Sequence, residues 1–202
     1  MWVEEKFSRY ISDKQNDARQ KGGVIKSALG YFEALSQHGY NLNFGDINDF
    51  DFDAEDYLNH IVILSHQISI PSKHWSNLDN FVKRGGTLIV DGLTGFYNEN
   101  AVCLMNNDFP LKNLFGGEVS EFKHVDKLFD LDVSGQKLKT HLWQGTIIPH
   151  TGTVISRNNN QPTGIINNYG KGKVFWIPSP LGLGAKISKE YEPLLSIFRT
   201  RI

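Results

Sequence analysis

The spacing of hydrophobic and polar residues predicts a parallel α/β unit in the first half of the chain. Residues 24–38 are followed by Gly39 and carry one apolar stripe at helical spacing, which predicts a helix with a glycine cap. The stripe consists of Ile25, Ala28, Leu29, Phe32 and Leu35. Continuous apolar runs at 60–65 and 87–91 predict two strands buried on both faces. Between them, residues 72–84 predict an amphipathic helix with a serine cap. A strand, a helix and a strand in this order form a right-handed βαβ unit with parallel strands.

The second half of the chain predicts shorter elements and an antiparallel extension of the sheet. Residues 116–162 contain only short alternating runs broken by Gly, Asn and Pro, and we assign no arrangement to them. The further expected elements are a strand at 40–44, a short helix at 110–115, a hairpin formed by 163–168 and 173–177, and a last helix from 188 to the C-terminus.

The composition is typical of one folded domain covering residues 1–202. The 202 residues are 40% hydrophobic and 12% aromatic, which argues against a disordered chain. Lys and Arg number 21 against 22 Asp and Glu, and this balance argues against binding to a phosphate backbone. No apolar run approaches the roughly 20 residues that span a bilayer. We therefore expect no nucleic-acid or membrane partner, and a soluble, cytoplasmic chain unless a longer parent carries a signal.

Motifs that would hold a metal or a nucleophile are incomplete. Residues 49–53 place aspartates at alternate positions, but the Gly and Glu that complete an EF-hand calcium loop are missing. The glycines at 170–172 lack the spacing of a phosphate loop. No serine or cysteine stands at the turn after the strand at 87–91, where a nucleophile elbow would lie. The single cysteine, Cys103, is expected to be a small buried side chain. We predict no catalytic residue, no metal and no cofactor.

Four polar residues follow the two buried strands and form the one candidate site. Ser65 and His66 come at the end of the first strand, and Asp91 and Thr94 at the end of the second. Open α/β sheets bind ligands beyond the carboxyl ends of their strands, so these side chains would line one crevice there. The alternative is that they cap helices and satisfy the backbone of the loops. The residues alone leave both interpretations open.

Tryptophan side chains are a second candidate feature, because flat rings pack on the apolar faces of sugars. Trp75 lies on the apolar face of the helix at 72–84, which favours a place in the core. Trp143 carries no such constraint. Trp176 alternates with Phe175 along a strand, and one of the two is expected to face outward if that strand is half buried.

One longer stretch of the chain resembles a known family. Residues 56–102, with "FVKRGGTL" at 81–88 and "NEN" at 98–100, are similar to the middle domain of family 42 glycoside hydrolases, the β-galactosidase trimerisation domain. The helix and strand within 24–44 fit the family's approach to this unit, and "GKGKVFWI" at 170–177 is similar to its closing hairpin. Together these pieces cover about half of the chain in the same order.

The resemblance implies a flavodoxin-like three-layer sandwich of the class I glutamine-amidotransferase-like superfamily, with a mainly parallel sheet and without the amidotransferase nucleophile. In such enzymes a separate barrel domain hydrolyses the glycoside, and this domain builds a trimer and borders the neighbouring active site. The family's first strand would fall within residues 1–5, and the segment 116–162 has no counterpart that we can place. The resemblance thus implies a non-catalytic accessory domain of a longer β-galactosidase-like glycoside hydrolase, forming a homo-oligomer.

The competing hypothesis is a stand-alone module that binds a carbohydrate or another small ligand, or a small hydrolase with an unrecognised site. The missing nucleophile elbow is the feature that separates the two. If the domain assembles, apolar surface should remain outside its core. Phe50, Phe52 and the pair at 96–97 are the candidates, and the alternative is that these rings pack over the ends of the sheet.

Overall fold

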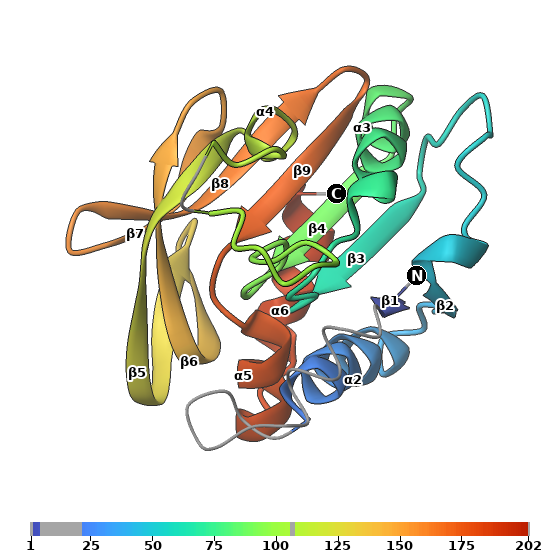
Figure 1. Ribbon diagram of the computed structural model, residues 1–202. Helices are drawn as coiled ribbons and strands as arrows, with labels where there is room; N and C mark the ends of the chain where they lie inside the picture. Colours follow the sequence, from blue (N-terminus) through green and yellow to red (C-terminus); the bar gives the residue numbers. More distant parts are fainter. Residues whose placement is uncertain (1, 5–21, 106–107, 202) are drawn as a thin grey trace.

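The computed structural model describes residues 2–4, 22–105 and 108–201, and these form a mixed sheet with helices on both faces (Figure 1). The sheet has nine strands within the described residues, in the order β2-β1-β3-β4-β9-β8-β7-β5-β6. The parallel strands are β1 (Trp2–Glu4), β2 (Phe44–Asp46), β3 (Ile61–Ser65), β4 (Thr87–Asp91) and β9 (Gly172–Ile177). The antiparallel strands are β5 (Gly117–Val133), β6 (Gln136–Pro149), β7 (Thr153–Asn158) and β8 (Gln161–Tyr169).

The predicted βαβ unit is confirmed. β3 and β4 pair in parallel along their whole length, from Ile61 with Thr87 to Ser65 with Asp91, and α3 (Trp75–Lys83) connects them. Ser72 was expected to cap this helix, but a 3-10 turn at Ser72–His74 precedes α3 and Ser72 does not cap it. Its hydroxyl group donates instead to the Glu99 carboxylate at 2.5 Å.

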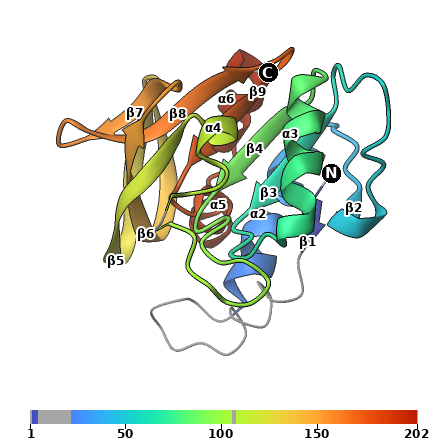
Figure 2. The same cartoon turned by 45° about the horizontal axis from the view of Figure 1, so that its top comes forward.

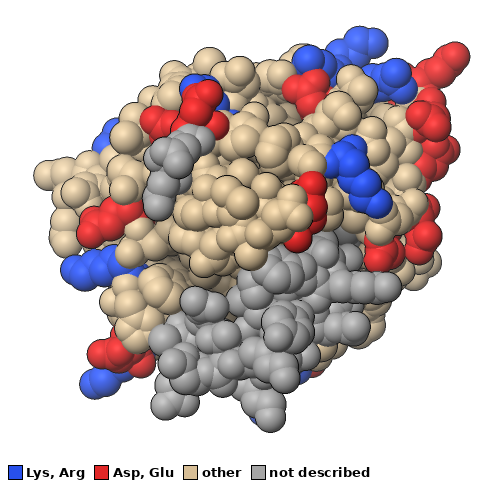
Figure 3. All heavy atoms as spheres, viewed as in Figure 1, with Lys and Arg blue, Asp and Glu red and all other residues tan. Residues whose placement is uncertain are grey.

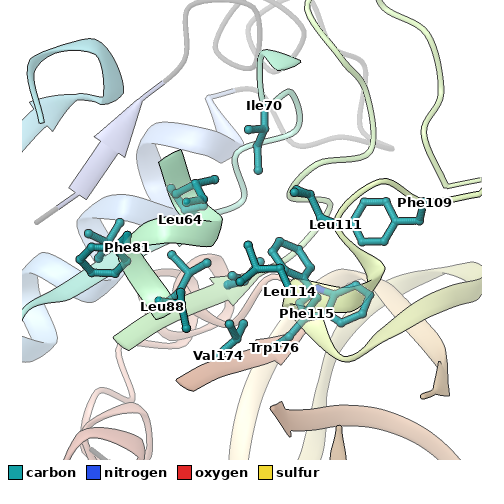
Figure 4. Packing of buried hydrophobic residues seen from close by; sticks show 14 of the residues in the cluster. Leu64, Ile70, Phe81, Leu88, Phe109, Leu111, Leu114, Phe115, Val174 and Trp176 are labelled. Carbon is teal, nitrogen blue, oxygen red and sulfur yellow. The ribbon is translucent and has the colours of Figure 1, made fainter. Parts of the chain in front are cut away.

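The helices cover the two faces of the parallel strands (Figures 1 and 2). α3 and the short α4 (Lys112–Phe115) lie on one face, and α2 (Gly23–Ser36), α5 (Leu181–Ser188) and α6 (Glu192–Arg201) lie on the other. Successive residues of a strand point to opposite faces, so each buried strand supplies both cores. Figure 4 shows the first core, in which the side chains of β3, β4 and β9 meet those of α3 and α4.

Strand β9 shows why two aromatic neighbours can both be buried. Trp176 is fully buried in the first core and Phe175 is 2% exposed in the second. One of them was expected to face outward if the strand was half buried, but helices cover both faces of this strand, so that condition is not met. β9 also pairs in parallel with β4, so only β8 of the predicted 163–177 hairpin extends the sheet antiparallel.

Other boundaries differ from expectation for local reasons. The strand expected at 40–44 is displaced to Phe44–Asp46, while the short first strand implied for residues 1–5 is present as β1. The last helix, expected from residue 188, is α6 and begins only at Glu192. A separate helix, α5, precedes it and ends where Lys189 adopts a left-handed conformation (φ 62°). Residues 117–149, left without assignment, form the long hairpin β5–β6 at the far end of the sheet from β2.

None of the helices in the described part of the chain is long and apolar enough to cross a membrane.

Helices α2 and α5 approach so closely that only glycine fits between them. A Cβ atom added to Gly30 would lie 1.9 Å from the carbonyl oxygen of Gly182, and one added to Gly182 would lie 2.3 Å from the carbonyl oxygen of Ser27. Both obstacles are backbone atoms, which cannot rotate away. The contact therefore fixes the distance between the two helices on this face of the sheet.

We predict that Gly30→Ala lowers the free energy of unfolding by about 1–3 kcal/mol, since the new methyl group forces α2 and α5 apart. Urea denaturation measures the change. Ser36→Ala, at an exposed position of the same helix, is the control and should alter stability by less than about 0.5 kcal/mol. Equal stabilities of Gly30→Ala and Ser36→Ala would contradict the close contact.

Candidate functional site

The structure brings the four predicted crevice residues together at the carboxyl ends of β3 and β4. Ser65 and Asp91 are paired across the two strands. The backbone N–H of His66 donates to Asp91 Oδ1 at 2.8 Å, and the hydroxyl group of Thr94 donates to the Asp91 carbonyl oxygen at 2.6 Å. The four residues therefore lie together at this edge of the sheet.

These side chains are buried: none of the four is more than 2% exposed. Their polar atoms satisfy the loops that leave the strands. His66 Nδ1 accepts the backbone N–H of Leu93 at 3.2 Å, and Thr94 Oγ1 accepts the backbone N–H of Gln67 at 2.9 Å. Burial lowers the pKa of His66 to about 4, so its ring is neutral near pH 7. The contacts favour the backbone-satisfying alternative, and ligand binding by these residues stays a prediction.

Sequence reasoning missed three further members of this cluster, which come from the helices of the second face. Tyr31 of α2 donates its hydroxyl proton to Asp91 Oδ2 at 3.2 Å, and the backbone N–H of Gly182 of α5 donates to the same oxygen at 2.9 Å. The hydroxyl groups of Ser27 and Ser65 lie 2.7 Å apart. The available signal was the spacing of Ser27 and Tyr31, which puts two polar groups on one helix face one turn apart.

The carboxyl group of Asp91 has a pKa far from its usual value. Burial raises its pKa to about 6, and its hydrogen bonds with Gly182, His66, Ser65 and Tyr31 oppose that rise. The same burial, together with the nearby Asp91, raises the pKa of Tyr31 well above its usual value. Within the described residues, no group of three or more His, Cys, Asp or Glu side chains is placed to hold a metal ion.

A cavity of about 330 Å³ lies next to this cluster. One side of it includes Ile68, two residues after His66, and Leu93, two residues after Asp91. Strands β5 and β6 contribute to the other side. Its lining consists of Ile68, Leu93, Phe96, Tyr97, Met105, Val119, Ser120, Glu121, Phe122 and Trp143. This is the concave, mainly apolar kind of surface on which small ligands bind.

The aromatic residues expected at an assembly surface are packed rather than free. The ring centroid of Phe50 lies 4.7 Å from that of Phe52 and 5.6 Å from that of Phe81. Phe50 and Phe52 therefore cover the end of the first core. Phe96 and Tyr97 are half-buried at the cavity. The alternative interpretation, packing over the ends of the sheet, is the one that the structure supports.

Two other predicted core residues are only half-buried. Trp75 packs against the first core, and its indole N–H donates to the Ile70 carbonyl oxygen at 3.1 Å. Cys103 packs against the same core, and its backbone forms an isolated β-bridge with Tyr97. It was expected to be buried but is partly exposed. On the face shown in Figure 3, charged side chains of both signs are scattered over the described surface, with uncharged surface between them.

Comparison with known proteins gives a consistent match. A family model described as "Beta-galactosidase trimerisation domain" matches residues 5–192. The curated β-galactosidase BgaA of Clostridium cellulovorans is 31% identical over 110 residues, which cover 50% of this chain and 17% of that protein. The chain therefore corresponds to a small part of this relative.

Solved structures share the fold at low sequence identity. A catalytic mutant of Gan42B, a GH42 β-galactosidase from G. stearothermophilus, superposes with a TM-score of 0.76 at 16% identity, covering 98% of this chain and 30% of that one. The β-galactosidase of the haloarchaeon Halorubrum lacusprofundi gives a TM-score of 0.74 at 14% identity, covering 96% and 30%. In both, the shared fold accounts for under a third of the longer protein.

The buried carboxyl group of Asp91 predicts a specific dependence of stability on pH. Its pKa of about 6 in the folded protein exceeds the value of about 3.9 of an unfolded aspartate, so folding favours the protonated form. The resulting stabilisation, on the order of 3 kcal/mol, is complete below about pH 4 and is lost as the pH rises through about 6. Asp91→Asn removes the titrating group and with it this dependence on pH.

The measurement is urea denaturation of the wild type and of Asp91→Asn between pH 4 and pH 7.5. We expect the stability of the wild type relative to the variant to fall by up to about 3 kcal/mol across this range. The control Asp53→Asn, at an exposed position, should show a constant difference. A wild-type advantage that grows as the pH rises would show that the charged form is the favoured one and would refute this assignment.

Proposed function

The chain belongs to the β-galactosidase trimerisation domain family, and on that premise we propose that it is the non-catalytic, oligomer-forming domain of a longer β-galactosidase-like glycoside hydrolase. The relatives support this proposal because the chain spans 17% of the curated relative and about 30% of the similar solved enzymes. A separate catalytic barrel in the parent and further copies of the chain are the proposed partners.

We further propose that residues 1–202 fold as one domain of the flavodoxin-like class. The parallel strands follow the order β2-β1-β3-β4-β9, which corresponds to the flavodoxin order 2-1-3-4-5. Helices on both faces of these strands support a three-layer description. The antiparallel strands β8, β7, β5 and β6 are then an addition at one edge of that sheet.

The observation that carries the non-catalytic proposal is the turn after β4. A nucleophile elbow places a reactive Ser or Cys at such a turn. Here the turn starts with Asp91, which is only 1% exposed. Its carboxyl oxygens accept hydrogen bonds from Tyr31, His66 and Gly182. A group so enclosed cannot reach a substrate, which supports a structural role at this position.

Exposed apolar side chains on α2 and β2 support the assembly proposal. Phe32 and Phe44 contact each other with ring centroids 5.1 Å apart and are 36% and 46% exposed. Ile25 (37%) on α2 and Tyr40 (45%) after it are further exposed apolar side chains. Exposed apolar patches often mark interfaces.

We predict that the isolated chain does not hydrolyse a nitrophenyl β-galactoside, glutamine or a peptide, because the turn after β4 offers no nucleophile. Product release should equal the buffer blank, with a complete family 42 β-galactosidase as the positive control. Turnover that a single substitution in this chain abolishes would overturn the proposal.

We predict that the parent protein is a homo-oligomer whose mass by light scattering corresponds to three chains, and that replacing both Phe32 and Phe44 with Ser weakens the assembly. Burying such rings contributes about 1.5–3 kcal/mol each, so the midpoint concentration of assembly should rise at least tenfold. Replacing the exposed Leu128 of β5 with Ser is the control. If the isolated chain and the parent protein are both monomeric, the proposed assembly role is refuted.

A further inference from the structure

Another cavity, of about 280 Å³, lies at the other end of the parallel strands from the buried cluster, beside the amino ends of β3, β4 and β9. Its lining includes the polar side chains of Thr87, Asn168, Lys171 and Lys173, and the described residues that line it include no Asp or Glu. Part of the glycine and lysine run at 170–173 therefore lies in a cavity, although this run has no part in the proposed function.

Three of these polar side chains form one row across the sheet. Thr87 of β4 pairs with Lys173 of β9, and Lys173 pairs with Asn168 of β8, with no shift of register between these strands. Thr87 lies two residues before Ile89 on its strand, and Lys173 lies two residues before Phe175. Ile89 and Phe175 belong to the second core. Because side chains alternate along a strand and directly paired residues share a face, all three polar side chains point to the second face of the sheet.

Thr87 is a buried polar side chain that the fold itself does not use. The residue is 7% exposed, and its hydroxyl group has no hydrogen-bond partner among the described residues. Other polar atoms without a partner are closed off from water, but the Thr87 hydroxyl oxygen is not one of them. This oxygen is therefore reached through the cavity that Thr87 lines, where only water or a bound group can pair with it.

Lys171 and Lys173 give the cavity a positive charge that the described part of the protein does not neutralise. Neither ammonium group forms an ion pair or a hydrogen bond with a described residue. The carboxylate of Asp56 lies nearby, next to the lining residue Gly85, and its Oδ1 accepts the backbone N–H of Leu58 at 2.8 Å. Two cations and an unpaired hydroxyl group thus meet in one space, which favours an anionic ligand.

The wall that carries the two lysines is rigid, because its turn packs backbone against backbone on the end of α3. The backbone N–H of Lys171 donates to the Lys83 carbonyl oxygen at 3.0 Å, and that of Lys173 donates to the Gly86 carbonyl oxygen at 3.3 Å. A Cβ atom on Gly172 would lie 2.2 Å from the same Gly86 oxygen, so only glycine allows this approach. The backbone of both lysines is therefore held in a fixed place beside β4.

We propose that this cavity binds a phosphate group, either as inorganic phosphate or as the phosphate of a small monoester. Such a group carries a charge of about −1.5 to −2 near pH 7, which matches the two lysines. Its oxygens can accept hydrogen bonds from Thr87, Lys173 and Asn168 together, because neighbouring strands lie only about 4.8 Å apart. A carboxylate has fewer oxygens for these donors, and a neutral sugar leaves the lysine charges unmatched. The volume of about 280 Å³ leaves room for a small organic group beside the phosphate.

The test is a titration of the ¹⁵N-labelled chain at constant ionic strength, followed by NMR. Inorganic phosphate and glucose 6-phosphate are the two phosphate probes, and glucose and acetate are the neutral and carboxylate comparisons. The amide resonances of Thr87, Lys171 and Lys173 should shift saturably with at least one phosphate probe, with a Kd of about 1 mM. Glucose should not shift them, and acetate should bind at least about tenfold more weakly. The phosphate probe that binds more tightly identifies the source of the group.

Substitutions in the polar row test the assigned contacts. Lys173→Gln should raise the Kd for the tighter phosphate probe at least about tenfold, whereas Lys127→Gln, at an exposed lysine of β5 outside the cavity lining, should leave it unchanged. Thr87→Val, which keeps the shape of the side chain but removes the hydroxyl group, should raise it at least about fivefold, and Thr87→Ser should restore binding. The proposal is overturned if neither phosphate probe gives a saturable shift, if acetate binds as tightly as phosphate, or if Lys173→Gln and Lys127→Gln have equal effects.

Discussion

The Asp91 carboxylate joins four elements of the fold through hydrogen bonds that have no access to water. It ends β4 and accepts N–H groups from the end of β3 at His66 and from the start of α5 at Gly182, while Tyr31 of α2 donates its hydroxyl proton. A buried carboxyl group is costly to charge, and each of these donors would be costly to leave unpaired. All of these hydrogen bonds form only when β3, β4, α2 and α5 lie in one arrangement. The Gly30–Gly182 contact further fixes the distance between α2 and α5.

This closure determines where the domain can meet other molecules. The carboxyl ends of β3 and β4, the usual ligand edge of an open parallel sheet, are occupied by the protein's own polar groups. The turn after β4 is held rigid as a result, and it supports an aromatic cavity formed with β5 and β6. A sheet edge filled in this way and an added hairpin agree with the accessory role that we propose for this domain.

How far the sequence predicts this structure depends on how local each signal is. The β3–α3–β4 unit was predictable because its apolar runs and its helical stripe are continuous. Helix α5 was missed because two glycines within Leu181–Ser188 suggest a loop, and they are required instead for contact with α2 and β6. On α2 the expected stripe included Ile25 and Phe32, yet these are exposed and the small or polar Ser27 and Tyr31 face inward.

The candidate site was predictable in part for the same reason. Ser65, His66, Asp91 and Thr94 were placed together by the rule that parallel strands end at one edge, but their enclosure depends on α2 and α5, which lie 60 and 91 residues from Asp91. Native-state hydrogen exchange tests that enclosure most directly. The account predicts that the amide protons of His66, Gln67 and Gly182 exchange only on global unfolding. Exchange of these amides within minutes, while the core of β4 stays protected, would show an open crevice and contradict it.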